Sequence, residues 1–298
     1  MIELHPPHLP LWLERALPFR RRFFSVDGRG VHVIDHGEGR PVLFVHGNPT
    51  WSFLWRKVLA RLTGRGLRLV AMDLIGFGLS DKPLRPSDHR LEMHVRVASD
   101  LVSGLGLDDV IIVGQDWGGP ISAGVAARSP ARVTGAVFAN TAILRPRRPL
   151  RPKAFHRLAH VPVVSEGLFI GGNFPVRFMG RVQADPTSLE PVARRAYRYP
   201  FRRVRDRAGP LGLARMVPDR EEHPSNAVLD ETDAWARSFT GPVGLVWGME
   251  DPILGRALAR HREVFQTASV VEAHAGHFLQ EEVPELLASA VLDVAGRS

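Results

Sequence analysis

Short apolar runs alternate with helical patterns along the first half of the chain and again near its end. The runs predict seven strands, at residues 31–34, 41–45, 67–71, 110–113, 133–139, 242–247 and 269–272. The run Val-Ile-Ile-Val at 110–113 is wholly apolar, as expected of a central strand that is buried on both faces. Strands that alternate with helices predict an α/β protein with a mostly parallel central sheet and helices on both of its faces.

Apolar residues recur at helical spacing in three segments. One helix is predicted over residues 51–62, where a continuous stripe is formed by Trp51, Leu54, Trp55, Val58, Leu59 and Leu62. The same spacing predicts helices over residues 91–105 and 283–294. Each stripe is a face that a helix can bury against the sheet.

The alternation stops between about residues 141 and 222. This segment is rich in Arg and Pro and has no apolar run suited to a central strand. We interpret it as an insertion of short helices, with helical content expected around 152–158 and 189–197. The predicted organisation is a main domain formed by residues 1–140 and 223–298, with a helical cap domain inserted at 141–222.

Composition excludes several classes of protein. A chain of 298 residues, 44% of them apolar, can bury a large core. The absence of Cys removes disulfides, thiol nucleophiles and Cys-ligated metal sites. No apolar run approaches the ~18 residues of a membrane span, and the first residues lack the pattern of a signal peptide. We therefore expect a cytoplasmic protein without a membrane partner.

The net charge of +8 is concentrated in one segment. Residues 141–222 hold 17 Lys and Arg against 7 Asp and Glu, whereas the rest of the chain holds 22 against 24. Only three of the basic residues are Lys, which favours a GC-rich coding bias over phosphate binding, and no nucleic-acid motif accompanies the charge. We expect no nucleic-acid partner and interpret the basic cap exterior as a solvated face, with self-association or weak anion attraction as alternatives.

Residues 113–119, V-G-Q-D-W-G-G, have the form G-x-nucleophile-x-G between a buried strand and a helical segment. A nucleophile on so tight a turn needs small residues two positions before and after it, here Gly114 and Gly118. The nucleophile position holds Asp116 rather than Ser. The alternative is that Asp116 merely caps the helix that follows.

Two later segments complete the order nucleophile, acid, histidine that is typical of the α/β-hydrolase fold. Asp251 follows the strand predicted at 242–247, and His277 follows the one at 269–272. Each candidate stands just beyond the carboxyl end of a predicted strand, where open α/β sheets place their sites. Glu250 is the next candidate for the acid, and we interpret His274 as structural.

The loop His46-Gly47-Asn48-Pro49-Thr50 directly follows the strand predicted at 41–45. In this fold, that loop supplies one backbone N–H of the oxyanion hole, and the residue after the nucleophile, here Trp117, supplies the other. The alternative for Asn48 is a turn former before Pro49.

Five segments together resemble the haloalkane dehalogenases of the α/β-hydrolase superfamily. They are H-G-N-P-T-W-S-F-L-W-R at 46–56, D-L-I-G-F-G-L-S-D-K-P at 73–83, G-Q-D-W-G-G-P at 114–120, W-G-M-E-D-P at 247–252 and A-G-H-F-L-Q-E-E at 275–282. Residues 197–201, Y-R-Y-P-F, also resemble the family's cap. The resemblance implies an α/β-hydrolase catalytic domain with an inserted helical cap.

The resemblance also implies roles for particular residues. The nucleophile maps to Asp116, the base to His277, and the halide-binding pair to Asn48 and Trp117. The second halide donor of the family is either an Asn in the early loop or a Trp in the cap. None of the six Trp lies within 141–222, so Asn48 is the matching candidate.

The family places its acid after one of two strands. The first site holds Asn140, which cannot ionise, so the acid falls to Asp251. The late acid together with Asn48 resembles a smaller subfamily.

The activity implied is hydrolysis of a small apolar haloalkane to a primary alcohol, halide and a proton through an ester on Asp116. A carboxylate can displace halide from carbon, and halide needs N–H donors rather than a proton. We expect no metal and no organic cofactor. Four apolar side chains of the cap are expected to form the pocket wall or the cap core: Phe169, Phe174, Phe178 and Met179.

Two alternatives remain. An epoxide hydrolase shares the Asp nucleophile but needs an acid for the alkoxide, usually a pair of cap Tyr residues. Tyr197 and Tyr199, the only Tyr residues, are two positions apart and are not expected to converge on one oxygen. From another class, a non-hydrolytic ligand-binding protein or a cofactor-free oxygenase can use the same fold. The intact set of candidate residues argues against a degenerate ligand-binding protein.

Overall fold

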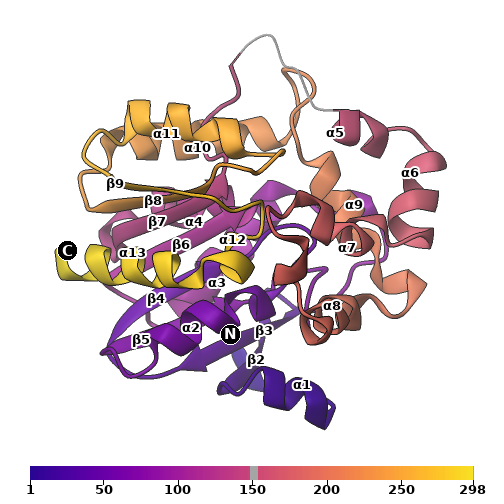
Figure 1. Cartoon of the computed structure of the whole chain (residues 1–298), viewed down its shortest axis with the longest axis horizontal. Coiled ribbons are helices and arrows are strands. Elements are labelled where there is room, and N and C mark those ends of the chain that lie inside the picture. Colours follow the sequence, from indigo (N-terminus) through magenta and orange to yellow (C-terminus); the bar gives the residue numbers. More distant parts are fainter. Residues whose placement is uncertain (148–153, 298) are drawn as a thin grey trace.

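The computed structural model describes residues 1–147 and 154–297. A single nine-stranded sheet forms the centre, with the strand order β1-β2-β3-β5-β4-β6-β7-β8-β9 (Figure 1). The strands are β1 (Ile2–Leu4), β2 (Arg21–Val26), β3 (Arg29–His36), β4 (Arg40–Val45), β5 (Leu67–Met72), β6 (Val110–Asp116), β7 (Val133–Thr141), β8 (Val243–Gly248) and β9 (Ser269–Ala273).

All seven predicted strands are present, and the sheet has two more. From β5 through β9 all neighbours pair in parallel, whereas β1, β2 and β3 are antiparallel to their neighbours. The first of the predicted strands therefore runs against its partner β5 rather than with it. The predicted mostly parallel sheet is confirmed, with an antiparallel extension at one edge.

Helices cover both faces of the sheet. On one face lie α2 (Arg56–Leu62) and α13 (Pro284–Arg297), and on the other lie α3 (Leu91–Gly104), α4 (Gly118–Arg128) and α10 (Ser225–Ser238) (Figure 1). Further helices are α1 (Leu11–Ala16), α11 (Leu258–Val264) and α12 (Leu279–Glu282). Among the residues described here, no helix is long and apolar enough to cross a membrane.

One predicted helix is divided in two, and another begins one residue later than predicted. The stripe at 51–62 begins as a 3₁₀ turn, η1 (Ser52–Trp55), and continues as α2. Of the stripe at 283–294, every residue except Val283 lies within α13, and Val283 is the C-cap residue of the separate turn α12. The break falls at Pro284, which has no N–H to donate to the preceding turn but suits the first position of a new helix.

The chain between β7 and α10 forms short helices that lie together at one end of the sheet, on the right in Figure 1. They are α5 (Ala154–Ala159), α6 (Val164–Glu166), α7 (Phe174–Arg177), α8 (Pro191–Arg198) and α9 (Ala208–Arg215), joined by 3₁₀ and π turns. The helix expected around 189–197 corresponds to α8. Of the helix expected at 152–158, residues 152 and 153 lie outside the described residues, and the remainder lies within α5.

The core lies on the two faces of the central strands. Val110, Ile111, Ile112 and Val113 of β6 are fully buried, as expected for a strand between two helical layers. The stripe that η1 and α2 present to the sheet is fully buried as well. Burial of a side chain of this size contributes about 1.5–3 kcal/mol, so this core holds the carboxyl ends of β4, β6, β7 and β8 in fixed positions.

Candidate active site

The turn between β6 and α4 carries Asp116 in a strained conformation. Its φ is +52°, which is rare for a residue with a side chain. A Cβ on Gly118 would lie 1.9 Å from the Val45 carbonyl oxygen, and one on Gly114 would lie 2.5 Å from the Gly118 carbonyl oxygen. The need for glycine at both positions is confirmed. Trp117, not Asp116, is the N-cap residue of α4, and no side chain caps this helix, so the interpretation of Asp116 as a cap is wrong.

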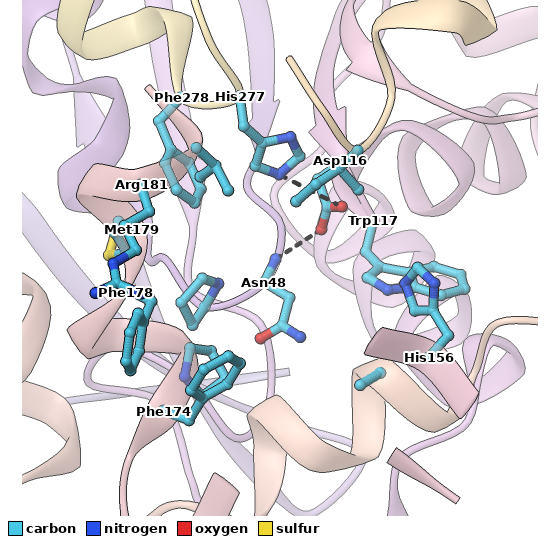
Figure 2. A pocket seen from close by; sticks show the side chains of 15 residues that line it. Asn48, Asp116, Trp117, His156, Phe174, Phe178, Met179, Arg181, His277 and Phe278 are labelled. Carbon is cyan, nitrogen blue, oxygen red and sulfur yellow. Dashed lines mark hydrogen bonds and ion pairs between the residues drawn. The ribbon is translucent and has the colours of Figure 1, made fainter. Parts of the chain in front are cut away.

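Three titratable side chains converge from the ends of β6, β8 and β9. His277 Nδ1 lies 2.9 Å from Asp251 Oδ2. His277 Nε2 lies 3.8 Å from Asp116 Oδ2, a contact that Figure 2 marks. Asp251 and His277 are almost completely buried, while the Asp116 side chain keeps 14% of its surface exposed. The imidazole thus stands between the two carboxylates, with one nitrogen toward each.

The surroundings of Asp116 and Asp251 shift the pKa values of the two carboxylates in opposite directions. Burial raises the pKa of Asp116, and the charge of His277 and the N–H groups of Asn48 and Trp117 oppose that shift. Burial acts in the same direction on Asp251, but His277 and hydrogen bonds from Asn140 outweigh it, so the pKa of Asp251 is lowered. Asp251 is therefore the more firmly ionised partner of the imidazole.

Asn140, at the end of β7, contacts the candidate acid directly. Its Nδ2 donates to Asp251 Oδ2 at 2.7 Å and to the Gly248 carbonyl at 3.0 Å, while its Oδ1 accepts from the Gly248 N–H at 2.7 Å. At position 140, the alternative place for an acid, the chain thus has an amide that donates a hydrogen bond to Asp251. Glu250, the other candidate, is exposed and lies 3.3 Å from the exposed His274, away from His277.

Gln115 is a site residue that sequence reasoning missed. It is fully buried, and its Nε2 lies 3.3 Å from His277 Nε2 and donates to the His277 carbonyl at 3.1 Å. A donor at Nε2 and a carboxylate at Nδ1 both favour the neutral tautomer that carries its proton on Nδ1. Gln115 directly precedes the candidate nucleophile Asp116 in the sequence, and this position could have indicated that it belongs to the site.

Asn48 and Trp117 lie on either side of the Asp116 carboxylate. The Asn48 backbone N–H donates to Asp116 Oδ1 at 2.8 Å. The Asn48 side-chain Nδ2 donates to the Pro210 carbonyl of α9 at 3.0 Å, which orients the amide and leaves its second N–H available. In Figure 2 the amide nitrogen is turned toward the side on which Trp117 lies. Asn48, Asp116 and Trp117 line one pocket.

A pocket of about 350 Å³ opens in front of these residues. Its wall is mostly apolar and includes Phe174, Phe178 and Met179 from the predicted cap, together with Ile253 and Phe278 (Figure 2). Phe169, the fourth candidate, is fully buried in a separate cluster inside the cap and does not line the pocket. A small apolar molecule fits this space.

Two further polar side chains reach the pocket, and no sequence pattern pointed to either. They are His156 of α5 and Arg181, whose guanidinium lies 4.5 Å from the ring centre of Phe178. His156 also lines an adjoining cavity of about 230 Å³, which shares Asp116, Trp117 and Ile253 with the first. The active-site space thus extends on both sides of Trp117.

The two tyrosines lie outside this pocket. Tyr197 is buried and donates to Glu281 at 2.6 Å, and Tyr199 packs edge-on against Trp12. Within the described ranges, no group of three His, Asp or Glu side chains is arranged to hold a metal ion.

Comparisons with known proteins identify similar chains over nearly the full length. A sequence profile described as the alpha/beta hydrolase fold matches residues 40–284. Haloalkane dehalogenase 2 of Mycobacterium tuberculosis is 35% identical over 284 residues, which cover 94% of this chain and 96% of that protein.

Two crystal structures extend the comparison. The haloalkane dehalogenase DatA from Agrobacterium tumefaciens C58 superimposes with a TM-score of 0.84 at 29% identity, covering 98% of this chain and 100% of that one. The haloalkane dehalogenase DpaA from Paraglaciecola agarilytica NO2, described as tetrameric, gives a TM-score of 0.82 at 25% identity, covering 98% of each chain.

Proposed function

Because this chain belongs to the haloalkane dehalogenase family of α/β hydrolases, enzymes that hydrolyse carbon–halogen bonds, we propose that its reaction passes through an ester on Asp116. The observation that carries this proposal is the placement of one carboxylate in an apolar pocket, between two N–H donors and an imidazole. The substrate proposed is a small apolar haloalkane, and the products are a primary alcohol, halide and a proton.

In the first step, a carboxylate oxygen of Asp116 attacks the carbon that bears the halogen. The new carbon–oxygen bond forms as the carbon–halogen bond breaks, and the electron pair leaves with the halide. Negative charge grows on the halogen, so N–H donors in an apolar site stabilise the transition state more than the substrate. Trp117 and Asn48 have this role.

In the second step, His277 takes a proton from water, and the hydroxide attacks the ester carbonyl of Asp116. Asp251 orients the imidazole and stabilises its cation. The oxyanion that forms accepts hydrogen bonds from the backbone N–H groups of Asn48 and Trp117. When this intermediate collapses, the ester bond breaks and the proton of the added hydroxyl passes to the departing oxygen, so the alcohol leaves and the carboxylate is restored. His277 then releases its proton to solvent.

The position of the tyrosines argues against an epoxide hydrolase. Tyr197 already donates its proton to Glu281, and neither Tyr197 nor Tyr199 lines the pocket, so neither can protonate a ring oxygen bound beside Asp116. A protein that only binds a ligand has no need of an imidazole placed between two carboxylates, as His277 is between Asp116 and Asp251.

Replacing His277 by Phe tests the mechanism, because only the second step uses the base. We expect this variant to release one equivalent of bromide from a 1-bromoalkane and then stop. The peptide that contains Asp116 should gain the mass of one alkyl group. The double variant Asp116→Ala, His277→Phe should gain no mass, and sustained turnover by His277→Phe would rule out His277 as the base.

Three further proposals concern the domain organisation, the location and the assembly of the protein. Residues 1–140 and 223–298 form the catalytic domain, and residues 141–222 form the cap that closes the pocket. We also propose a cytoplasmic location. Association into a homo-oligomer is proposed on the similarity to a tetrameric relative.

A further inference from the structure

A groove of about 690 Å³ lies between α1 and α8, and it shares no lining residue with the active-site pocket. It is lined by Pro10, Trp12, Pro191, Arg194, Arg195, Arg198, Tyr199 and Arg202. Four of the eight residues are arginines, and none is acidic. The groove is therefore a concave site of one charge sign.

None of these four guanidinium groups pairs with a carboxylate within residues 1–147 and 154–297. Elsewhere, arginines that are also exposed have such partners. Arg96, Arg237 and Arg262 lie 2.9, 2.8 and 2.8 Å from Asp27, Asp233 and Glu272, respectively. Like charges in one groove repel one another, and a bound anion would remove that repulsion.

Three of the four guanidinium groups are held in place by other parts of the chain. Arg194 donates to the carbonyl groups of Leu189 and Pro186 at 2.8 and 2.7 Å. Arg195 lies 4.0 Å from the ring centre of Trp12. Arg202 lies 4.0 Å from that of Tyr199. Side chains that are already ordered lose less entropy when a ligand binds.

The two aromatic rings tie the walls of the groove together. Trp12 of α1 packs edge-on against Tyr199, which follows α8, with 6.0 Å between ring centres. A guanidinium already covers one face of each ring, so the aromatic residues serve to fix the arginines. This arrangement favours recognition of charge over stacking of a nucleobase.

We propose that this groove binds a soluble ligand that carries two or more phosphate groups. Guanidinium groups match phosphate oxygens with paired hydrogen bonds, and several arginines on two walls can contact neighbouring phosphates at once. A concave site suits a compact polyanion, whereas a flat membrane surface would meet only its rim. The proposal is independent of the chemistry at Asp116.

Titration of the intact protein with inorganic tripolyphosphate tests the proposal, by calorimetry and by the fluorescence of Trp12. We expect saturable binding of one ligand per chain, with orthophosphate binding more weakly. The double variant Arg195→Ala, Arg198→Ala should lose at least about tenfold in affinity, since it removes two charge-assisted contacts. In Trp12→Phe the fluorescence change should disappear while the calorimetric signal remains.

A matched control separates the groove from net charge. Arg65→Ala, Arg90→Ala removes the same two charges from exposed positions outside the groove, and it should bind tripolyphosphate as the unaltered protein does. The proposal is overturned if both double variants lose affinity equally, or if tripolyphosphate shows no saturable binding. Arginine-dependent binding only to vesicles of anionic phospholipid, or only to single-stranded RNA, would also overturn it. Circular dichroism of each variant checks its folding.

Discussion

Asn140 and Asp251 stand at the ends of adjacent strands, within one hydrogen bond of each other. Both Asn140 Nδ2 and His277 Nδ1 contact the same oxygen, Asp251 Oδ2. A carboxylate placed at position 140 would therefore start close to the imidazole. From either position, 140 or 251, a carboxylate would therefore lie near the same nitrogen, His277 Nδ1.

Asp251→Asn should slow the hydrolytic step by orders of magnitude. Loss of the corresponding acid in serine enzymes costs about 10⁴ in rate, because the wrong tautomer is held and the cation is unsupported. Adding Asn140→Asp to this variant should restore part of the rate, since the new carboxylate lies beside His277. Steady-state halide release measures both effects. Glu250→Gln serves as the control and should be near normal; an equal loss there would reassign the acid.

The halide site should respond to Asn48→Ala. The variant removes a preorganised donor, which costs about 10²–10³ in rate at comparable sites, so carbon–halogen cleavage should slow by this factor. This variant should also bind bromide or iodide more weakly, and the saturable change in Trp117 fluorescence measures that binding. Asn226→Ala is a matched control, because the Asn226 side chain also donates to backbone carbonyls but lies outside the pocket. Only linear quenching, with halide release unchanged in Asn48→Ala, would show that the halide pair is wrong.

Residues fixed by a local motif could be predicted, and residues brought in by distant packing could not. Asp116 was predictable because its turn requires glycines at fixed positions. The orientation of the Asn48 amide depends on the Pro210 carbonyl, 162 positions away along the chain. His156 lies in a segment where short helices obscure any periodicity, so its approach to Trp117 follows from the folded cap alone.

A buried ion pair between α2 and α12 is joined by a tyrosine of α8, a helix of the segment predicted to be the cap. Arg56 of α2 donates to both carboxylate oxygens of Glu281 in α12, at 2.5 and 2.9 Å, and Tyr197 of α8 donates to the same group at 2.6 Å. The Glu281 side chain is fully buried and that of Arg56 is 10% exposed. Although burial acts in the opposite direction, the hydrogen bond and charge of Arg56 leave the pKa of Glu281 lowered, so the pair stays ionised.

Glu281→Leu should destabilise the protein far more than Tyr197→Phe. Removing Glu281 strands a buried guanidinium, at a cost of about 3–5 kcal/mol, whereas removing the tyrosine hydroxyl deletes one hydrogen bond to a charge, worth about 1.5–3 kcal/mol. Urea unfolding of both variants measures the difference. Arg56→Met in the Glu281→Leu background should recover much of the stability, because the buried guanidinium is then removed. Lys57, which lies 3.1 Å from the Glu281 carboxylate, is 25% exposed and keeps its hydrogen bond to the backbone carbonyl of residue 281. A smaller loss in Glu281→Leu than in Tyr197→Phe would contradict this account.

Most elements with a buried apolar face were predicted, whereas an edge strand without one left no pattern to detect. All three residues of β1 are exposed, so this edge strand leaves no apolar pattern. The helix α10 was missed although Val228, Leu229, Thr232 and Trp235 form a buried helical stripe that was readable in the sequence. The direction of β3 was missed because apolar patterning shows that a strand is buried and does not show how it is connected.

Buried neutral histidines set the response of the whole molecule to acid. His46 Nδ1 donates to the Gly47 carbonyl at 2.9 Å, and His46 Nε2 accepts from the Leu74 N–H at 2.9 Å. Neither nitrogen can take a further proton without breaking a hydrogen bond. Burial lowers the pKa of His46, His89 and His261 from 6.5 to about 4 in each case.

The free energy of unfolding should therefore fall as the pH drops from 6.5 to 4. In this range the unfolded chain takes up protons at these histidines and the folded chain does not, so protonation favours unfolding. Each histidine contributes on the order of 3 kcal/mol across the full window, and three together rival the stability of a typical domain. Asp73, with a pKa of about 2 instead of 3.8, adds a further loss only below pH 3.8, since its stabilising charge is present above that value. Urea unfolding at pH 7.5, 5.5 and 4.5 measures the slope, which His261→Gln should reduce in part, since burial also lowers the pKa of His94 and of His223. A stability that stays constant between pH 7 and 5 would mean that these histidines are protonated in the folded protein.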